Sequence, residues 1–257
     1  MTTMLEVVGL SRRFGGVNAL TNVAFSTEHG EIFGIIGPNG AGKTTLFNVV
    51  TGAVPPSSGT VRFAGATITR LGTDRIARMG LVRTFQATVV FKSHTVRENL
   101  RRGSLFSRLG RPLSLIRFGP FHTADAEADT KADEILAFLS LESVATNRAG
   151  DLAYGLQKIL GVGMALAASP RMLLMDEPAA GLNPAETASL GALLLRVRNE
   201  WHIDVAVVEH DMQMIMGICD RIMVLNNGKV ICIDTPARVR VNPVVIDAYL
   251  GTDHEFA

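Results

Sequence analysis

The sequence has 257 residues, of which 47% are hydrophobic and 19% are charged, and its formal net charge is +1. This composition excludes a disordered chain and supplies a core for one large domain or two small ones. A net charge so close to zero indicates no particular class of partner. The two cysteines, Cys219 and Cys232, do not have the spacing of a metal site, so we expect two buried thiols in a reducing cytosol.

Membrane-spanning and export segments are not predicted. No apolar run approaches the roughly 18–20 residues that cross a bilayer. Residues 1–14 also lack the charged region and the following apolar region of a secretion signal. We therefore expect a soluble, cytoplasmic chain that reaches a membrane only through a partner.

The N-terminal part of the chain is predicted to be mainly strands. Residues 4–10 and 17–25 have the apolar spacing of strands, and the short apolar run 31–36 predicts a buried strand before a glycine cluster. Residues 43–51 then suit a helix. The turn PPSSG precedes another predicted strand at 59–63.

The pattern becomes helical from about residue 95 to residue 170. Residues 124–141 carry apolar side chains on one side and acids on the other, as an amphipathic helix does. A second helix over 155–168 is expected to end at Ser169-Pro170, because the residue before a proline avoids the helical conformation.

Strands return in the last third of the chain, with helical stretches between them. Apolar, branched runs predict strands at 171–176, 203–210 and 221–225, and NNG at 226–228 predicts a final hairpin. The alternation of strand and helix predicts a mostly parallel sheet covered on both faces. The helical stretch described above would be an insertion into that sheet.

A basic stretch stands apart at residues 101–121. It contains no acid, and its arginines are Arg101, Arg102, Arg108, Arg111 and Arg117. One interpretation is a surface loop near anionic lipid heads or a partner. The favoured interpretation is a solvated insertion with a small apolar anchor, because most basic stretches are simply exposed.

The most specific motif is GPNGAGKT at residues 37–44, which matches the phosphate-binding pattern G-x-x-x-x-G-K-[ST]. Its glycines let backbone N–H groups curl around phosphate oxygens, and the dipole of the following helix points at the same anion. Lys43 is predicted to reach the β- and γ-phosphates, and Thr44 offers a hydroxyl to Mg²⁺. A predicted strand before the motif and a predicted helix after it support this interpretation.

A carboxylate for Mg²⁺ is expected at the end of a neighbouring strand. In MLLMDEP, Asp176 emerges at the carboxyl end of a buried strand, where ligands bind in open α/β sheets. Glu177 follows and could polarise the attacking water as general base. The alternative for Glu177 is an acid that starts a helix before Pro178.

A histidine ends the next predicted strand, in VAVVEHD. His210 would lie beside the same sheet edge, where an imidazole can hydrogen-bond a γ-phosphate and the attacking water. The alternative is a surface histidine that caps the helix starting near Asp211.

Together these motifs resemble the nucleotide-binding subunit of an ABC transporter, over essentially the whole chain. GPNGAGKT resembles the family's Walker A loop, and MLLMDEP resembles its Walker B strand with the catalytic glutamate. RTFQ resembles the Q-loop, so Gln86 would be the glutamine that senses Mg²⁺ and water. AAGLNP (179–184) stands at the D-loop position, and His210 matches the switch histidine.

The resemblance implies that ATP and Mg²⁺ bind here. Phe14, in RRFGG, matches the aromatic that stacks on adenine, with Val17 beside it; its alternative is a core aromatic. Lys43, Gln86, Glu177 and His210 would be catalytic, and Thr44, Gln86 and Asp176 would bind the metal. The implied phosphate contacts are Gly37, Pro38, Asn39, Gly40, Ala41, Gly42, Lys43, Thr44 and Thr45.

LAYGLQK at 152–158 occupies the family's signature position, usually L-S-G-G-Q. In that family two subunits pack head to tail, and the signature of one closes over the γ-phosphate held by the other. The implied contacts are Leu152, Ala153, Tyr154, Gly155 and Leu156. Ala153 replaces the usual serine, Tyr154 a glycine and Leu156 the glutamine, while Asn183 replaces the usual D-loop aspartate, which predicts weakened γ-phosphate contact at the partner's site.

The resemblance also implies the architecture. It predicts a P-loop NTPase of the α/β class with a mostly parallel sheet, an N-terminal antiparallel β subdomain and an inserted helical subdomain. The whole of 1–257 would be one ABC ATPase domain. Within it, 1–87 and 171–235 would form the RecA-like core, 88–170 the helical subdomain, and 236–257 a helical tail.

GLVRTFQ, the long insertion, AAGLNP and the ending NPVVIDAYLG narrow the resemblance to the larger ATP-binding subunit of branched-chain amino acid importers. That subunit pairs with a second ATP-binding subunit, here expected to be a different chain rather than a copy. Other implied partners are membrane permeases and, indirectly, a periplasmic or surface substrate-binding protein; no nucleic acid is expected. The chain would lie at the inner face of the membrane. The substrate inference comes from the family alone, because substrate does not touch this subunit.

Other functions stay open from the sequence. Urea or amide importers and a lipopolysaccharide exporter use closely related ATPases. A soluble ABC ATPase acting on ribosomes or DNA is disfavoured by the lack of a tandem cassette or a long coiled-coil insertion. A regulatory module that binds ATP with little turnover remains compatible with the altered signature. Val89, Val90 and Phe91 are candidates for the permease-docking groove, or are simply core of the helical subdomain.

Overall fold

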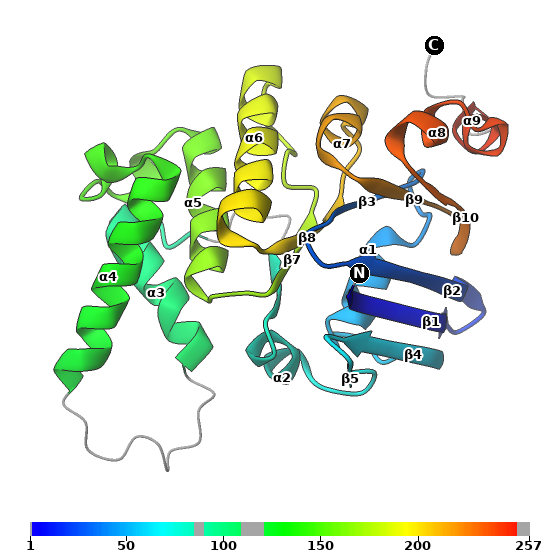
Figure 1. Cartoon of the computed structure of the whole chain (residues 1–257), viewed down its shortest axis with the longest axis horizontal. Coiled ribbons are helices and arrows are strands. Elements are labelled where there is room, and N and C mark those ends of the chain that lie inside the picture. The colour runs from blue at the N-terminus through cyan, green and yellow to red at the C-terminus, as the bar shows by residue number, and fades with distance from the viewer. Residues whose placement is uncertain (1, 85–89, 109–120, 251–257) are drawn as a thin grey trace.

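The computed structural model describes residues 2–84, 90–108 and 121–250 (Figure 1). In this part of the chain the strands form two sheets. A four-stranded sheet has the order β2-β1-β4-β5, and a six-stranded sheet has the order β10-β9-β3-β8-β7-β6. The predicted α/β class with an antiparallel N-terminal sheet is confirmed.

The smaller sheet is antiparallel throughout. Its strands are β1 (Thr3–Phe14), β2 (Val17–Glu28), β4 (Ser58–Phe63) and β5 (Ala66–Thr67). The first two extend beyond the predicted ranges because their pairing continues to the turn, where Phe14 faces Val17. This hairpin brings both residues to one end of the sheet.

The larger sheet is parallel except for β10, which forms the predicted hairpin with β9. Its strands are β3 (Ile32–Ile36), β6 (Leu81–Thr84), β7 (Met172–Asp176), β8 (Asp204–Val208), β9 (Arg221–Asn226) and β10 (Lys229–Asp234). Every residue of β3, β7 and β8 is buried, as expected for central parallel strands. The sequence analysis did not predict β6, because four residues at a sheet edge carry too little pattern.

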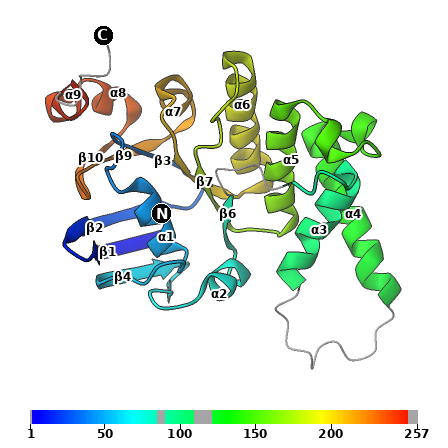
Figure 2. The same ribbon diagram turned by 180° about the vertical axis from the view of Figure 1, so that it is seen from behind.

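Helices surround this sheet and form a separate group at one side (Figures 1 and 2). They are α1 (Lys43–Val50), α2 (Thr73–Arg78), α3 (Val96–Arg108), α4 (Phe121–Leu139), α5 (Tyr154–Ala167), α6 (Pro184–Trp201), α7 (Met212–Ile218), α8 (Pro236–Arg240) and α9 (Pro243–Leu250), with 3₁₀ turns η2 (Glu142–Val144) and η3 (Ala149–Asp151). The predicted helix 124–141 begins earlier and stops at Leu139, because Ser140 has a positive φ of 57°. The helix predicted over 155–168 ends before Pro170, as expected.

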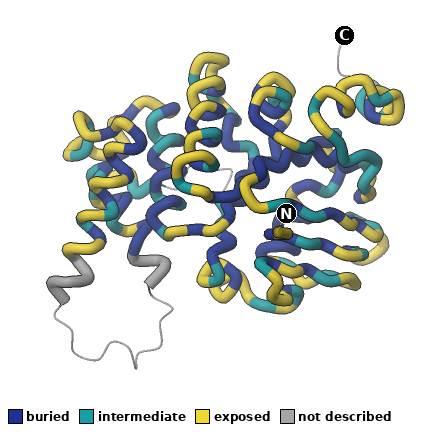
Figure 3. Tube along the Cα trace, viewed as in Figure 1, coloured by how far each residue is buried: buried dark blue, intermediate teal, exposed yellow. Residues whose placement is uncertain are grey.

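Two apolar clusters lie on opposite faces of the six-stranded sheet. Alternate residues of β7 divide between them: Leu173 and Met175 face the helices, whereas Met172 and Leu174 face α1 and the antiparallel sheet. The buried segments of Figure 3 follow this central sheet. One face of the six-stranded sheet is therefore covered by helices only. The other face is covered by α1 and the antiparallel sheet together.

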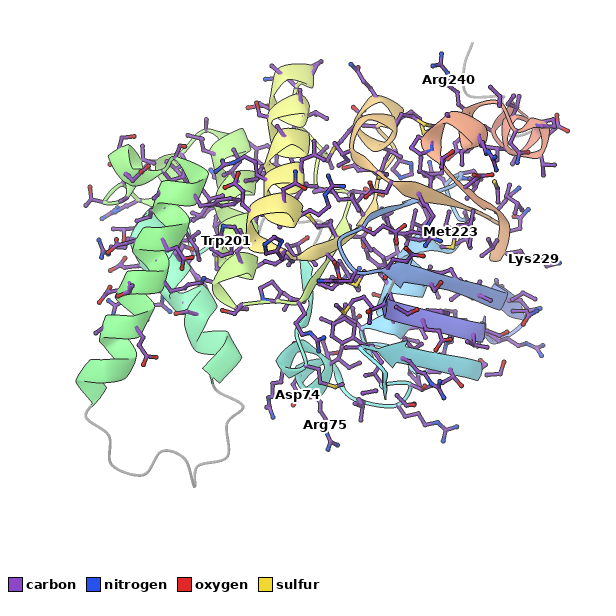
Figure 4. All side chains as sticks on the ribbon, in the orientation of Figure 1. Asp74, Arg75, Trp201, Met223, Lys229 and Arg240 are labelled. Carbon is purple, nitrogen blue, oxygen red and sulfur yellow. The ribbon has the colours of Figure 1, made fainter. Side chains whose placement is uncertain are left out.

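Side chains at the edges of the molecule show how the outer elements are anchored (Figure 4). Trp201, at the end of α6, packs against Phe138 of α4 at a ring-centroid distance of 5.0 Å. Asp74 and Arg75 point outward from α2 and are exposed. The long helix α6 thus joins the helical group to the sheet.

Two arginines in the described part of the basic stretch contact neighbouring side chains. Arg101 pairs with Asp129 at 3.1 Å, and Arg102 approaches His94 at 2.6 Å. These contacts favour a structural role for the two arginines over lipid binding. The side chain of Arg108 and residues 109–120, with Arg111 and Arg117, lie outside the described residues.

Two further predictions have simple outcomes. Both cysteines are free thiols; Cys219 is buried as predicted, whereas Cys232 is only half-buried. Burial raises the pKa of the Cys219 thiol to about 12. Among the described helices, none is both long and apolar enough to span a bilayer.

Candidate active site

The turn between β3 and α1 curls tightly because glycines permit it. Gly37 and Gly42 have φ values of 154° and 103°. A Cβ on Gly37 would collide with the carbonyl oxygen of Leu225, and one on Gly42 would lie 2.6 Å from that of Ala19. The turn is also bound to the β9–β10 hairpin, since the Gly228 amide donates to the Ala41 carbonyl at 2.9 Å. The result is a fixed run of amides at the N-terminus of α1, which suits a phosphate group.

Lys43 is the charged centre of this turn. Its side chain is only 6% exposed, and its ammonium donates to the carbonyls of Gly37 at 2.6 Å and Pro38 at 3.0 Å. Burial lowers the pKa of Lys43, and the nearby carboxylates of Glu177 and Asp176 partly oppose that shift. The electrostatics therefore place both predicted carboxylates next to the predicted phosphate-binding lysine.

The other predicted phosphate-loop residues surround this lysine. Thr44 begins the exposed side of α1, and Thr45 is half-buried. Asn39 and Gly40 form the exposed tip of the turn, and Pro38 and Ala41 close its base. Gln86 lies outside the described residues.

Asp176 ends β7 and is nearly buried, with 3% of its surface exposed. Its Oδ2 accepts a hydrogen bond from Arg83 Nη2 at 2.6 Å. Arg83 lies on the neighbouring strand β6 and donates through Nη1 to Asn48 of α1 at 2.5 Å. The arginine therefore ties the predicted metal carboxylate to the helix that follows the phosphate loop.

Arg83 was not among the predicted site residues. Its only signal in the sequence is its place in GLVRTFQ, three residues before Gln86. Recognising its role requires the pairing of β6 with β7, which sets Arg83 opposite Leu174.

Glu177 and His210 meet at the ends of adjacent parallel strands. His210 Nε2 lies 2.9 Å from Glu177 Oε1. Glu177 has a positive φ of 48°, and its amide donates to the Val208 carbonyl at 2.8 Å. This unusual backbone turns the carboxylate toward the histidine, and such strained residues cluster at functional sites.

The alternatives for these two residues do not fit the structure. Glu177 does not start a helix, because α6 begins only at Pro184. The N-cap of α7 is Asp211, whose side chain accepts from the Met214 amide at 2.8 Å. His210 is therefore not the capping residue, and its ring lies against Glu177.

Phe14 and Val17 lie on the outside of the hairpin formed by β1 and β2. They are 44% and 68% exposed, so the interpretation of Phe14 as a core aromatic is wrong. The guanidinium of Arg12 lies 4.3 Å from the centre of the Phe14 ring. An exposed aromatic beside a cation can stack on a planar ligand.

The predicted signature residues form the start of α5. Ala153 is the N-cap residue, and its methyl group cannot accept a hydrogen bond from the first turn. Leu152 and Gly155 are buried, and Leu156 packs partly into the main core. Tyr154 is exposed and its hydroxyl donates to the Ala180 carbonyl at 3.4 Å. The first amides of α5 therefore have no side-chain cap from Ala153.

The start of α6 packs directly against this helix start. Asn183 caps α6 because its side-chain oxygen accepts from the Glu186 amide at 3.0 Å, and the Glu186 carboxylate in turn accepts from the Asn183 amide at 3.0 Å. The Glu186 side chain also presses on Gly155, where a Cβ would lie 2.5 Å from its Oε1. Asn183 replaces the aspartate usual in the family, but it still caps the helix, since its side-chain oxygen accepts as an aspartate oxygen would.

The predicted residues therefore form two separate groups. Lys43, Asp176, Glu177 and His210 lie together around the phosphate loop, whereas residues 152–156 lie at the start of α5. In both views α5 lies on one side of α6 and α1 lies on the other side (Figures 1 and 2). One chain thus does not bring its own signature residues to its own phosphate loop.

The C-terminal helix α9 reaches the phosphate loop through Tyr249, which sequence reasoning also missed. Burial raises the pKa of the Tyr249 hydroxyl to about 12, while a hydrogen bond from the Gly37 backbone acts in the opposite direction. Only an N–H donor stabilises a phenolate, so Gly37 donates this bond. Tyr249 also packs against the main core. Nothing local in the ending DAYLG indicates this contact.

A curled run of amides, a buried ammonium and a carboxylate turned toward an imidazole suit one reaction, the attack of water on a bound triphosphate, and the surrounding fold is that of a P-loop ATPase. A family model for ABC transporters matches residues 20–180. The high-affinity branched-chain amino acid transport ATP-binding protein BraF of Pseudomonas aeruginosa is 43% identical, over 96% of this chain and 98% of BraF. The chain therefore belongs to the ABC transporter family, as one of its ATP-hydrolysing cassettes.

Further comparisons agree. The corresponding protein of Escherichia coli K12, LivG, is 42% identical over 96% of this chain and 98% of its own. A model for branched-chain amino acid ATP-binding cassette transporters matches residues 229–255. Among solved structures, an ABC transporter cassette in its ADP conformation matches with a TM-score of 0.86 at 32% identity, covering 98% of this chain and 100% of that one.

Proposed function

We propose that this chain hydrolyses ATP to power an importer of branched-chain or related amino acids. The relatives BraF and LivG, which are ATP-binding proteins of high-affinity branched-chain amino acid transport, support this substrate class. It would work at the inner face of the membrane with permease subunits, supplied by a periplasmic or surface substrate-binding protein.

The phosphate loop would bind the triphosphate. The amides of residues 37–45 and the Lys43 ammonium would hold the β- and γ-phosphates, and Phe14 with Val17 would cover the adenine. Thr44, Asp176 and Gln86 would hold Mg²⁺. When bound, the metal would supply positive charge beside the phosphates. The glycine cradle, the buried Lys43 and the adjacent Asp176 carboxylate fit this assignment.

Water activation would fall to Glu177. Its carboxylate would take a proton from the water that attacks the γ-phosphate, and His210 would hold that carboxylate in place through the contact of 2.9 Å.

A second ATP-binding subunit would complete the site. Residues 152–156 lie apart from the phosphate loop of their own chain, which supports a head-to-tail dimer in which each signature covers the other subunit's γ-phosphate. We propose a different chain as the partner, because Ala153 and Leu156 remove polar side chains from this signature. Only the helix dipole and the backbone amides of α5 would then contact the phosphate.

The permease would dock where the core meets the helical group. A largely apolar cavity of about 530 Å³ opens there, lined by β6 and α2 on one side and α3 and α5 on the other. It supports a division into a core (1–87 and 171–235), a helical subdomain (88–170) and a tail (236–257). Val90 packs partly into the main core, Phe91 lies against His94, and Val89 lies outside the described residues.

The contact between Glu177 and His210 carries the proposal. Purified protein should hydrolyse ATP, and faster with its partner subunit. Glu177→Ala should abolish turnover and trap bound ATP, whereas the matched variant Glu200→Ala, which removes an exposed acid that pairs with Arg196, should behave as wild type. Normal hydrolysis by Glu177→Ala would remove Glu177 from the mechanism.

A second candidate is a regulatory module that binds ATP with little turnover. The apolar residues Ala153 and Leu156 at the start of α5 favour it, because they weaken the site lent to the partner. Tight ATP binding without hydrolysis, even in the presence of partner subunits, would select this function.

A further inference from the structure

A carboxylate that the proposed mechanism does not use lies between its two catalytic loops. Glu209 follows β8 directly and is only 4% exposed. Its Oε1 accepts a hydrogen bond from the Ala179 amide at 2.6 Å, and its Oε2 accepts from the His210 amide at 2.9 Å. The Asp211 amide also approaches Oε2, at 3.4 Å. Backbone N–H groups from both loops thus compensate the cost of burying this charge.

These bonds join the segments that carry Glu177 and His210. Ala179 is two residues after Glu177, and the other donors are His210 itself and the residue that follows it. Within the described residues two further contacts join these segments: the Glu177 amide donates to the Val208 carbonyl at 2.8 Å, and His210 Nε2 lies 2.9 Å from Glu177 Oε1. Glu209 adds to these contacts a buried carboxylate that accepts from the backbone of both segments, on the side that follows Glu177.

Helix capping does not explain this residue. Asp211 already caps α7, so Glu209 is not needed for that purpose. A side chain with a single acceptor could satisfy one loop, but only a carboxylate presents two oxygens that accept from both sides at once. This requirement for two acceptors is what points to a link between the loops.

We propose that Glu209 is a positioning residue that sets the separation of Glu177 and His210 and so the geometry of water activation. The inference rests on the proposed function, because it acts through Glu177 and His210. It predicts that losing the bridge lowers kcat while ATP binding at the phosphate loop is retained, since Lys43 and its glycine cradle do not contact Glu209.

The first test is Glu209→Gln in the full chain. The amide keeps one acceptor but turns its NH₂ group toward a backbone N–H, so one loop loses its bond. We expect kcat for ATP to fall about 10- to 100-fold, in the range for misplaced catalytic groups, with the ATP dissociation constant changed less than about threefold. Glu209→Asp, which keeps the charge but is too short to reach both loops, is the second variant in case the first does not fold.

Asp204 provides a matched control at the opposite end of the same strand. It is fully buried and accepts from the Gly30 amide at 2.6 Å, but it lies far from the catalytic loops along β8. Asp204→Asn should lower the unfolding temperature and leave kcat of the folded protein unchanged. Equal losses of kcat in the two variants would reduce Glu209 to a structural residue and overturn the proposal.

A double-mutant cycle separates positioning from general damage. In a His210→Ala background, Glu209→Gln should reduce the residual kcat less than about threefold, because the pair that it positions is already broken. If Glu209→Gln lowers kcat by the same factor in the His210→Ala background as in the wild type, the inference is overturned. If the wild-type protein does not hydrolyse ATP, the proposed function itself is overturned. If the wild type hydrolyses ATP and Glu209→Gln has the same kcat, only the role of Glu209 is overturned.

Discussion

The phosphate-loop end of the molecule and the signature end use opposite chemistry. Around the phosphate loop, polar and charged side chains are paired: the buried Lys43 bonds to carbonyls, the buried Asp176 to Arg83, and the half-buried Glu177 to the exposed His210. At the start of α5, most of the corresponding positions are apolar or small, and the polar contacts come from the Tyr154 hydroxyl and from the capping box of α6.

This difference shows where replacements of the family's usual residues are tolerated. A buried charge loses its function when its partner is replaced, because the desolvation cost is then uncompensated. A helix start offers backbone amides whatever its side chains are. The substitutions Ala153 and Leu156 therefore fall in the region that depends least on side-chain chemistry.

The largest effect is expected from a substitution in the phosphate loop. Lys43→Ala removes a buried ammonium that lies near both carboxylates and would hold the phosphates, so ATP turnover should fall about 10²- to 10³-fold. Steady-state hydrolysis and calorimetric titration with ATP measure it. The control Lys131→Ala removes an ammonium paired with Glu134 on α4, at 2.9 Å, and should change neither. Retained ATP affinity and turnover in Lys43→Ala would contradict the whole assignment of this site.

The next effect tests whether Asp176 depends on its arginine. Arg83→Ala leaves the buried Asp176 carboxylate without this partner, so the free energy of unfolding should fall by about 3 kcal/mol. Urea denaturation measures it, and magnesium titration of ATP binding should show a changed metal requirement. Arg62→Ala breaks an exposed pair with Glu6 and should cost less than about 1 kcal/mol. If both variants lose the same free energy of unfolding, the buried pair contributes no more stability than the exposed pair.

A gain is expected at the signature end. Ala153→Ser supplies the missing cap of α5, so unfolding should require about 1 kcal/mol more free energy. The new hydroxyl should also speed hydrolysis at the site of the partner subunit. Ala185→Ser makes the same change at the start of α6, where Asn183 already caps, and should give no gain. The prediction fails if both serines act alike in thermal unfolding.

The smallest effect is expected for ATP affinity when a tyrosine near the phosphate loop is replaced, and a tyrosine at the start of α5 serves as its control. Tyr249→Phe removes the hydroxyl that receives the Gly37 amide, so ATP affinity should weaken about three- to fivefold, equivalent to roughly 1 kcal/mol. Tyr154→Phe removes a hydroxyl that contacts Ala180 and should leave ATP affinity of the isolated chain unchanged. Equilibrium titration with ATP distinguishes them. Identical affinities would mean that α9 does not influence the phosphate loop.

Local patterns predicted the parts of the site that lie within one stretch of chain. The glycines and Lys43 sit in eight consecutive residues, and Asp176, Glu177 and His210 each end an apolar run. The edge strand β6 escaped prediction because its four residues carry no strong period. The predicted cover on both faces of the sheet is present, but the antiparallel sheet contributes to it on one face, which the alternation of strand and helix did not indicate.

The sequence by itself determined the fold class, the phosphate loop and the strand-end carboxylates, because each depends on residues close together in the chain. The tertiary structure alone decided which distant residues support them. Arg83 reaches Asp176, Glu209 bridges to Ala179, and Tyr249 meets Gly37 across most of the chain. These contacts depend on the strand order β10-β9-β3-β8-β7-β6, and no local periodicity of apolar residues specifies which strand lies beside which.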